Sequence, residues 1–330
     1  MRRRDFITLV GGTAVMPTLR PLVARAPQSP LPEIGFMSAR SPEDSVYVLA
    51  SFHKGLEEGG FVDGRNVKIE YRWARGDYAL LPTFATEFVS RKVKVLVATG
   101  GDASTRAARA ATATIPIVFT IGGDPVKAGL VDSYNRPGGN ATGCVVLSND
   151  LEPKRLGLLR EIVPGDYRFG ALINPNFPPA ADQLNDLENA ARKIGRDLFV
   201  AKASDEVELD TAFAALLRER VGGLVVASDP FFDTRRDSII AFAAKNRLPA
   251  IYQFREYAID GGLISYGPSI TDSYRQVGFY AGRILSGTKP TDLPVVEATT
   301  FDFVINLKTA KALGLTIPPS LLATADEVIE

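Results

Sequence analysis

Two patterns of apolar residues alternate along most of this chain. Runs that are almost wholly apolar are typical of strands buried on both faces of a parallel sheet. Segments with apolar residues every three or four positions predict helices that bury one face. The expected strands are 33–37, 93–98, 115–121, 141–147, 169–173, 198–201, 223–227, 249–252 and 262–266. The expected helices are 41–58, 81–90, 103–113, 179–194, 209–218 and one that ends near 246.

One segment follows a different pattern. Val67, Ile69, Tyr71 and Trp73 alternate with charged residues, which is typical of an exposed or edge strand. Strands that alternate with helices favour parallel sheets covered by helices on both faces. The order of elements occurs twice, so we expect an α/β fold with two doubly wound parallel-sheet lobes.

Length and charge narrow the class of protein. The chain has 330 residues, which suits two domains. Lys plus Arg and Asp plus Glu both total 38, so no basic surplus points to nucleic acid as a partner. Cys144 is the single cysteine, so no intramolecular disulfide can form. We expect a monomer.

The first 26 residues look like an export signal. Residues 1–4 carry three arginines, and a short apolar stretch with small residues follows at 6–16. The string Arg3–Ile7 resembles the twin-arginine motif of proteins that are exported folded. Ala24–Ala26 is the expected cleavage site, although Pro27 after it is unfavourable. No cysteine of a lipid anchor precedes the expected mature domain, so we predict free protein in the periplasm.

A ligand site is expected where the parallel strands end, because ligands of open α/β sheets bind beyond the carboxyl ends of the strands. Small, hydroxyl and acidic residues dominate these loops, and together they suit a small zwitterion with an apolar group. In this interpretation Asp124 and Asp229 would hold an ammonium group. The candidate ligand-binding residues are Ser38, Thr99, Gly100, Gly101, Thr120, Asp124, Asn174, Ser228, Asp229 and Tyr252.

Each candidate also has a purely structural interpretation. Thr99–Gly101 also suits a tight turn from strand to helix with no binding role, and Asp124 and Asp229 each precede a proline and suit the cap of a helix. Aromatic residues near these loops are as readily explained by core packing. The alternatives stay open at the level of sequence.

No residue pattern in the sequence indicates catalysis or metal binding. The lone histidine, His53, lies beside an apolar helical position, and Cys144 falls in an expected strand. One histidine and one cysteine cannot form a His/Cys metal cluster, and no nucleophile elbow, phosphate-binding loop or zinc motif is present. We therefore expect no catalytic residues, no metal, no cofactor and no enzyme.

Longer motifs identify a family. The chain resembles ABC-transporter substrate-binding proteins related to bacterial tryptophan/tyrosine-type binding proteins over residues 31–330. The segments that carry this resemblance are Gly64–Arg72, Ile115–Phe119, Gly123–Val126, Gly129–Val131, Arg136–Gly143, Lys154–Arg155, Gly261–Pro268, Asp292–Pro294, Asn306–Leu315 and Ala325–Ile329.

The resemblance implies a type I periplasmic binding-protein fold, in which two lobes joined by three crossovers close on a solute by hinge motion. By analogy, lobe 1 comprises 31–148 plus 269–290, and lobe 2 comprises 149–268 plus 291–330. It also implies a role as the receptor of an importer, with an ABC permease in the inner membrane as partner. Some relatives bind aromatic amino acids, so an aromatic or other apolar amino acid is the candidate ligand.

Other functions compete with this one. A ligand-sensing module for signalling or regulation shares the fold, although a regulator would need a DNA-binding segment before the first strand. A receptor that hands its closed form to a chemotaxis protein has the same sequence features. A carboxylate-dependent hydrolase would show a strongly perturbed acid in the cleft.

Overall fold

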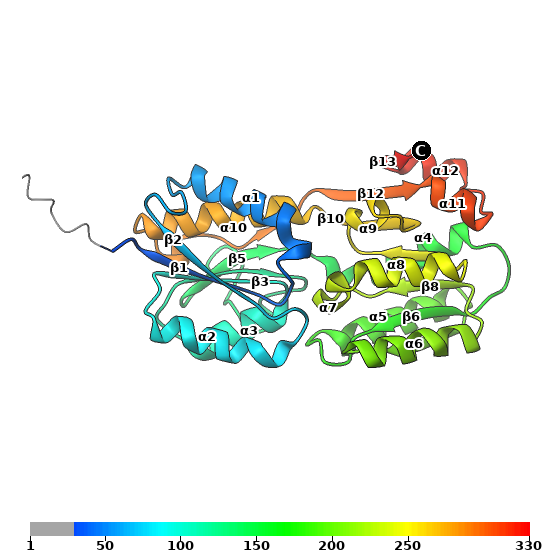
Figure 1. Cartoon of the computed structure of the whole chain (residues 1–330), viewed down its shortest axis with the longest axis horizontal. Coiled ribbons are helices and arrows are strands. Elements are labelled where there is room, and N and C mark those ends of the chain that lie inside the picture. The colour runs from blue at the N-terminus through cyan, green and yellow to red at the C-terminus, as the bar shows by residue number, and fades with distance from the viewer. Residues whose placement is uncertain (1–29) are drawn as a thin grey trace, which may run out of the picture. The chain divides into compact units, whose positions relative to one another are not determined.

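The computed structural model describes residues 30–330, so the predicted signal peptide lies outside the described residues. This part of the chain forms two β-sheets, and helices connect most of the successive strands (Figure 1). All strand pairs are parallel except β10 with β12. The α/β class and the predominantly parallel sheets confirm the prediction.

The first sheet has six strands in the order β11-β5-β4-β3-β1-β2. Its strands are β1 (Glu33–Ser38), β2 (Lys68–Trp73), β3 (Val95–Thr99), β4 (Ile117–Ile121), β5 (Ala141–Val145) and β11 (Val296–Glu297). Strand β2 lies at the edge, as its alternating pattern predicted.

The second sheet has seven strands in the order β13-β12-β10-β9-β8-β6-β7. Its strands are β6 (Phe169–Ile173), β7 (Leu198–Lys202), β8 (Gly223–Val226), β9 (Ala250–Tyr252), β10 (Ile264–Pro268), β12 (Phe301–Asn306) and β13 (Glu327–Ile329). The hydrophobic pattern did not predict the last two strands or β11.

Helices cover both faces of each sheet. On the first sheet these are α1 (Val46–Glu58), α2 (Leu81–Ser90), α3 (Asp102–Ala111) and α10 (Ile270–Leu285). On the second they are α4 (Glu152–Ile162), α5 (Ala180–Lys193), α6 (Glu206–Arg218), α7 (Pro230–Thr234), α8 (Arg236–Lys245), α9 (Arg255–Ile259), α11 (Leu307–Leu313) and α12 (Pro319–Thr324). The single helix expected up to about residue 246 is therefore two helices, α7 and α8. Within residues 30–330, no helix has the length and apolar character needed to cross a bilayer.

The chain crosses between the two sheets three times: after β5, after β10 and after β11. Helix α10 packs beside α1 on the first sheet although it follows β10 of the second (Figure 1). Backbone bonds tie the crossovers together, from Ala298 N to Val145 O at 2.8 Å and from Ser269 N to Thr300 O at 2.9 Å. Two or three short segments of this kind form a hinge about which packed lobes can rotate.

One predicted boundary needs correction. The second lobe was expected to resume at residue 291, but β11 pairs with β5 of the first sheet. The hydroxyl of Thr142 also donates to Leu293 O at 2.6 Å, which holds this segment on the first lobe. The third crossover therefore follows Glu297. Residues 296–297 have no clear strand pattern of their own, and they form a strand because their backbone pairs with the open edge of β5.

Buried apolar side chains occupy both faces of both sheets. One core includes residues of α2 and α3 against the first sheet, and another includes residues of α4 and α5 against the second. Cys144 is 2% exposed within the core that α1 and α10 share, and burial raises the pKa of its thiol. This agrees with its interpretation as a small buried hydrophobe.

Candidate functional site

The order of strands determines where the loops diverge. Strand β1 lies between β2 and β3 in the first sheet, and β6 lies between β7 and β8 in the second. Successive connections leave such a central strand in opposite directions, so a crevice opens at the carboxyl ends of the strands. The loops after β1 and β3 carry Arg40 and Gly100, and the loop after β8 carries Asp229.

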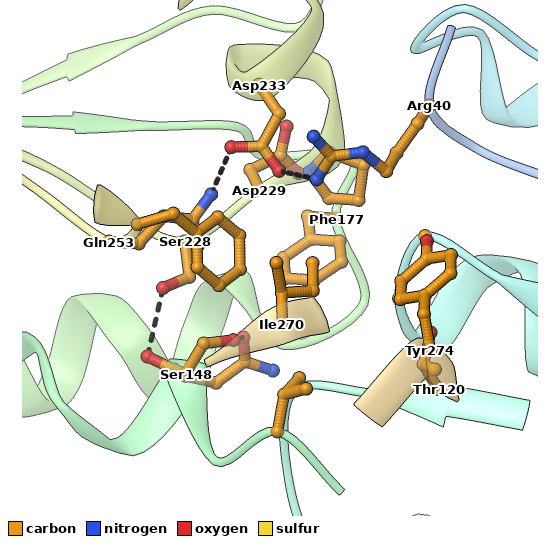
Figure 2. A pocket seen from close by; sticks show the side chains of 17 residues that line it. Arg40, Thr120, Ser148, Phe177, Ser228, Asp229, Asp233, Gln253, Ile270 and Tyr274 are labelled. Carbon is orange, nitrogen blue, oxygen red and sulfur yellow. Dashed lines mark hydrogen bonds and ion pairs between the residues drawn. The ribbon is translucent and has the colours of Figure 1, made fainter. Parts of the chain in front are cut away.

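Residues from both lobes enclose a small cavity at this place (Figure 2). Its volume is about 40 Å³, whereas pockets for small molecules usually measure roughly 300–1,000 Å³. A solute the size of an amino acid therefore enters only when the lobes move apart. The lining residues are Arg40, Gly100, Gly101, Thr120, Gly122, Val146, Ser148, Asn149, Phe177, Ser228, Asp229, Pro230, Asp233, Gln253, Phe254, Ile270 and Tyr274.

Five of the predicted ligand residues line this cavity: Gly100, Gly101, Thr120, Ser228 and Asp229. Gly100 has a φ of +74°, and a Cβ there would lie 2.8 Å from the backbone nitrogen of Ala39. Only glycine suits this turn, which brings backbone close to the cavity.

Three further candidates stand behind the lining. Ser38 and Thr99 are wholly buried at the ends of β1 and β3, and the hydroxyl of Ser38 accepts a hydrogen bond from Arg40 N at 3.2 Å. Asn174 donates from Nδ2 to Asp229 Oδ1 at 3.1 Å. These residues shape and orient the groups that line the cavity.

Two predicted residues, Asp124 and Tyr252, do not line this cavity. Asp124 is exposed on a separate surface groove, where its carboxylate accepts from Val126 N at 2.8 Å and from Lys127 N at 3.3 Å. It caps a turn, which is the structural interpretation that its Asp-Pro sequence had left open. Tyr252 lies inside the second lobe, 1% exposed, with its ring stacked 4.7 Å from that of Tyr257.

Asp229 is the N-cap of α7, and its carboxylate accepts four hydrogen bonds. Its Oδ1 accepts from Phe231 N at 2.8 Å, Phe232 N at 3.3 Å and Asn174, and its Oδ2 accepts from the hydroxyl of Tyr78 at 2.6 Å. Each carboxylate oxygen has two lone pairs, so three donors share Oδ1 and one acceptor site of Oδ2 stays free. Burial raises the pKa of Asp229 to about 7 in spite of these donors.

The strongest link across the cavity is an ion pair that the sequence did not predict. Arg40 follows β1, and its Nη1 donates to Asp233 Oδ2 in α7 at 2.7 Å. Both side chains are buried, at 2% and 3% exposed. Burial raises the pKa of the Asp233 carboxyl, and the charge of Arg40 opposes that shift. The pair joins the first lobe to the second (Figure 2).

A second buried pair lies in the second lobe below the cavity. Arg155 and Glu152 of α4 are both wholly buried, with Nη1 and Oε1 3.2 Å apart. Arg155 also donates to the hydroxyl of Ser228 at 2.9 Å and to Ser148 O at 3.1 Å, at the first crossover. The network therefore links the cavity residue Ser228 to the first crossover.

The aromatic lining also differs from expectation. Phe177, Phe254 and Tyr274 line the cavity, whereas Tyr252 was the aromatic residue among the sequence candidates. Tyr274 lies in α10, more than a hundred residues after the loops of its own lobe, so only the crossover from the second sheet brings it here. Arg40 could have been proposed as a cavity residue from the sequence, because it lies in a strand-end loop, two residues beyond the end of β1.

The described residues contain no group of three or more His, Cys, Asp or Glu side chains placed to hold a metal ion. A cavity lined by two lobes and spanned by hydrogen bonds from both defines a class of two-lobed, hinge-closing binding proteins.

Known proteins place the chain within this class. Residues 43–329 match the family model described as ABC transporter substrate binding protein. A tyrosine-binding protein of Clostridioides difficile is 31% identical over 269 residues, covering 80% of this chain and 75% of the relative. This chain belongs to the ABC transporter substrate-binding protein family, whose members bind small molecules and are not enzymes.

Solved structures show the same fold. A conserved domain protein of Vibrio cholerae has 28% identity and a TM-score of 0.82, covering 90% of this chain and 99% of that one. The ligand-free, open structure of a Clostridium difficile substrate-binding protein with adhesive properties has 26% identity and a TM-score of 0.61, covering 91% and 99%. An ABC domain of Streptococcus pneumoniae in complex with L-Trp has 24% identity and a TM-score of 0.79, covering 91% and 100%. The fold is that of the type I periplasmic binding proteins, as the sequence predicted.

Proposed function

We propose that this protein is the periplasmic receptor of an ABC importer, and that it captures an aromatic or other apolar amino acid between its lobes. The observation that carries the proposal is the cavity itself, because residues of both lobes line it. Five of the candidate ligand residues line it, which supports the proposal: Gly100, Gly101, Thr120, Ser228 and Asp229. Phe177, Phe254 and Ile270 add apolar surface suited to a ring.

The relatives support the choice of ligand class and of lobe closure. The relative from Clostridioides difficile, 31% identical, is a tyrosine-binding protein. The chain also superimposes less well on an open structure, with a TM-score of 0.61, than on one with bound ligand, at 0.79. The two differ little in sequence identity, and the lower score against the open structure supports a more closed arrangement of lobes in this chain.

The rest of the role follows from this receptor function. The protein acts as a monomer that crosses the inner membrane with a twin-arginine signal in residues 1–26. The closed form, with solute inside, docks on an ABC permease in the inner membrane. The permease can distinguish the closed form from the open one, because closure of the hinge changes the relative position of the two lobe surfaces.

A thermal-shift and calorimetric screen of residues 31–330 tests the proposal. The panel holds L-tyrosine, L-tryptophan, L-phenylalanine, L-leucine, sugars and a dipeptide. A ligand at 100 times its dissociation constant adds about 2.7 kcal/mol to the free energy of unfolding. We expect this shift with one or more of the aromatic amino acids and with no sugar.

Folded protein that responds to none of the apolar amino acids would overturn the ligand class. The importer role has its own test, which is uptake of the labelled amino acid by cells that lack the gene. Uptake that stays at the normal rate after the receptor is lost would contradict that role, even where binding is tight.

A further inference from the structure

Tyr78 of the first lobe covers the Asp229 carboxyl of the second lobe. It lies in a short 3-10 helix between β2 and α2, and its hydroxyl donates to Asp229 Oδ2 at 2.6 Å. The other three donors to Asp229 are Asn174 and the backbone N–H groups of Phe231 and Phe232, all of the second lobe. Separation of the lobes would therefore break the Tyr78 bond and admit water to the carboxyl, while the other bonds stay in place.

Every donor to Asp229 is electrically neutral. The four donors are a phenol, a side-chain amide and two backbone N–H groups, so none supplies a positive charge. Asp229 is only 2% exposed, and a buried charge is costly unless a group of opposite charge accompanies it. A charged Asp229 consequently opposes closure of the lobes, whereas a neutral Asp229 does not.

The charges that line the cavity do not remove this cost. Among the described residues of the lining, Arg40 is the only basic one, and it is paired with Asp233 and with Asp44 (Figure 2). Asp233 lies in α7, as do the residues that Asp229 caps, and its negative charge adds to the effect of burial in raising the pKa of Asp229. The lining therefore has one guanidinium and two carboxyls.

The charges on the other sides of Asp229 are also engaged. Tyr78 and Asn174 line an open groove between the lobes, and the Glu152–Arg155 pair lies behind Ser228. The charged residues of the groove have partners of their own: Arg75 pairs with Glu43, Arg235 pairs with Glu206, and Asp77 and Asp205 accept from backbone N–H groups as N-caps. Within residues 30–330, none of these neighbouring cations is left to balance Asp229.

We propose that closure of the empty lobes takes up a proton at Asp229, so that acid favours the closed receptor even without a solute. This inference deepens the proposed function, because it sets a condition for closure of the same cavity, and it rests on the hinge motion proposed there. A proton needs no added space, so it can neutralise Asp229 in a cavity of about 40 Å³, which is too small for an amino acid.

The direction of the effect follows from where the proton is held more tightly. Burial raises the pKa of Asp229 to about 7 in this arrangement, whereas a carboxyl in water titrates near about 3.9. Between these values the closed form binds more protons than the open form. The ratio of closed to open protein therefore falls by up to about tenfold for each unit that the pH rises, and it is constant above about pH 7.

Small-angle X-ray scattering of the empty protein, residues 31–330, measures this ratio through the radius of gyration. We expect the radius to increase as the pH is raised from about 5 and to level off above about pH 7. A radius that is the same at every pH in this range, or that decreases as the pH rises, would overturn the proposal.

Two substitutions test whether Asp229 is the group that takes up the proton. Asp229→Asn keeps an N-cap of the same shape without a charge, so its radius is expected to stay at the low-pH value throughout. Asp124→Asn is the matched control, because Asp124 also precedes a proline and accepts from backbone N–H groups but does not line the cavity. The control should respond to pH as the unmodified protein does. An unchanged pH response in Asp229→Asn would show that another group is responsible.

A second variant covers the case in which Asp229→Asn does not fold, which its melting temperature shows. The Tyr78 hydrogen bond lowers the pKa of Asp229 against the effect of burial. Tyr78→Phe removes this bond, so the radius should level off at a higher pH than in the unmodified protein. Levelling off at the same or a lower pH would contradict the assignment to Asp229.

The outcomes distinguish this inference from the proposed function, because scattering is measured without a solute. A pH-dependent radius in a protein that binds no apolar amino acid would overturn the ligand class and support proton uptake. Tight binding of L-tyrosine, L-tryptophan or L-phenylalanine together with a radius independent of pH would overturn proton uptake alone.

Discussion

At the scale of single residues, burial changes the pH at which the Asp229 carboxyl loses its proton. Asp229 is 2% exposed, and burial raises the pKa of its carboxyl to about 7. The unfolded chain would titrate near the ordinary aspartate value of about 3.9. The folded protein consequently binds more protons than the unfolded chain between these two pH values, and it loses this advantage as pH rises through about 7.

Asp229→Asn tests this protonation. The variant keeps an N-cap for α7 and is uncharged at every pH, so its stability should depend less on pH. Between about pH 4 and 7 we expect the free energy of unfolding of the unmodified protein to fall, relative to the variant, by at most about 1.4 kcal/mol per pH unit. Urea unfolding at several pH values measures the difference, and parallel curves for the two proteins would contradict it.

At the scale of elements, helices α1 and α10 pack at unusually close range through glycine. A Cβ on Gly278 would lie 2.0 Å from Phe52 O, and a Cβ on Gly55 would lie 1.8 Å from Arg275 O. Neither neighbour can yield without moving backbone. Because α10 also carries Tyr274, this contact helps to fix a cavity residue.

Gly278→Ala should therefore destabilise the protein by about 3 kcal/mol or more, since overpacking costs about 1–3 kcal/mol even where side chains can adjust. Gly157→Ala in α4 is the matched control, because a Cβ there meets nothing within 4 Å. The control should gain up to about 1 kcal/mol from helix propensity. Thermal or urea unfolding of both variants gives the comparison; equal stability of the two would contradict the close contact.

At the scale of the whole molecule, Arg40 and Asp233 link the lobes through a buried ion pair. Removal of one partner from such a pair costs about 3–5 kcal/mol, because the other charge stays buried without compensation. Opening of the lobes would return Asp233 to water and relieve that cost. The pair thereby favours the closed arrangement.

Arg40→Met should shift the protein toward open lobes. Small-angle X-ray scattering is expected to show a larger radius of gyration than that of the unmodified protein. The double variant Arg40→Met/Asp233→Asn removes the uncompensated charge and should recover much of the closed arrangement. The same radius for all three proteins would show that this pair has no part in closure.

Much of the architecture was predictable because its signals are local. A strand buried on both faces needs an apolar run, and a helix needs its 3.6-residue period, so β3, β4, α2 and α5 were found within a few residues of their bounds. Parallel strands end at the same edge of a sheet, so the loops that follow them could be located from the sequence. Gly100 and Asp229 lie in those loops and were therefore among the predicted residues. Strands β11 to β13 were missed, because they are short or paired with distant partners.

The sequence by itself determined the α/β fold, the family and the loops that surround the cavity, because each depends on patterns that neighbouring residues share. Tertiary structure alone decided which side chains face the cavity. Asp124 turned out to cap an exposed turn and Tyr252 to pack in a core, whereas Arg40 and Tyr274 line the site. The physical reason is that burial and hydrogen-bond partners come from segments far apart in the chain, and only the crossovers between the sheets bring those segments together.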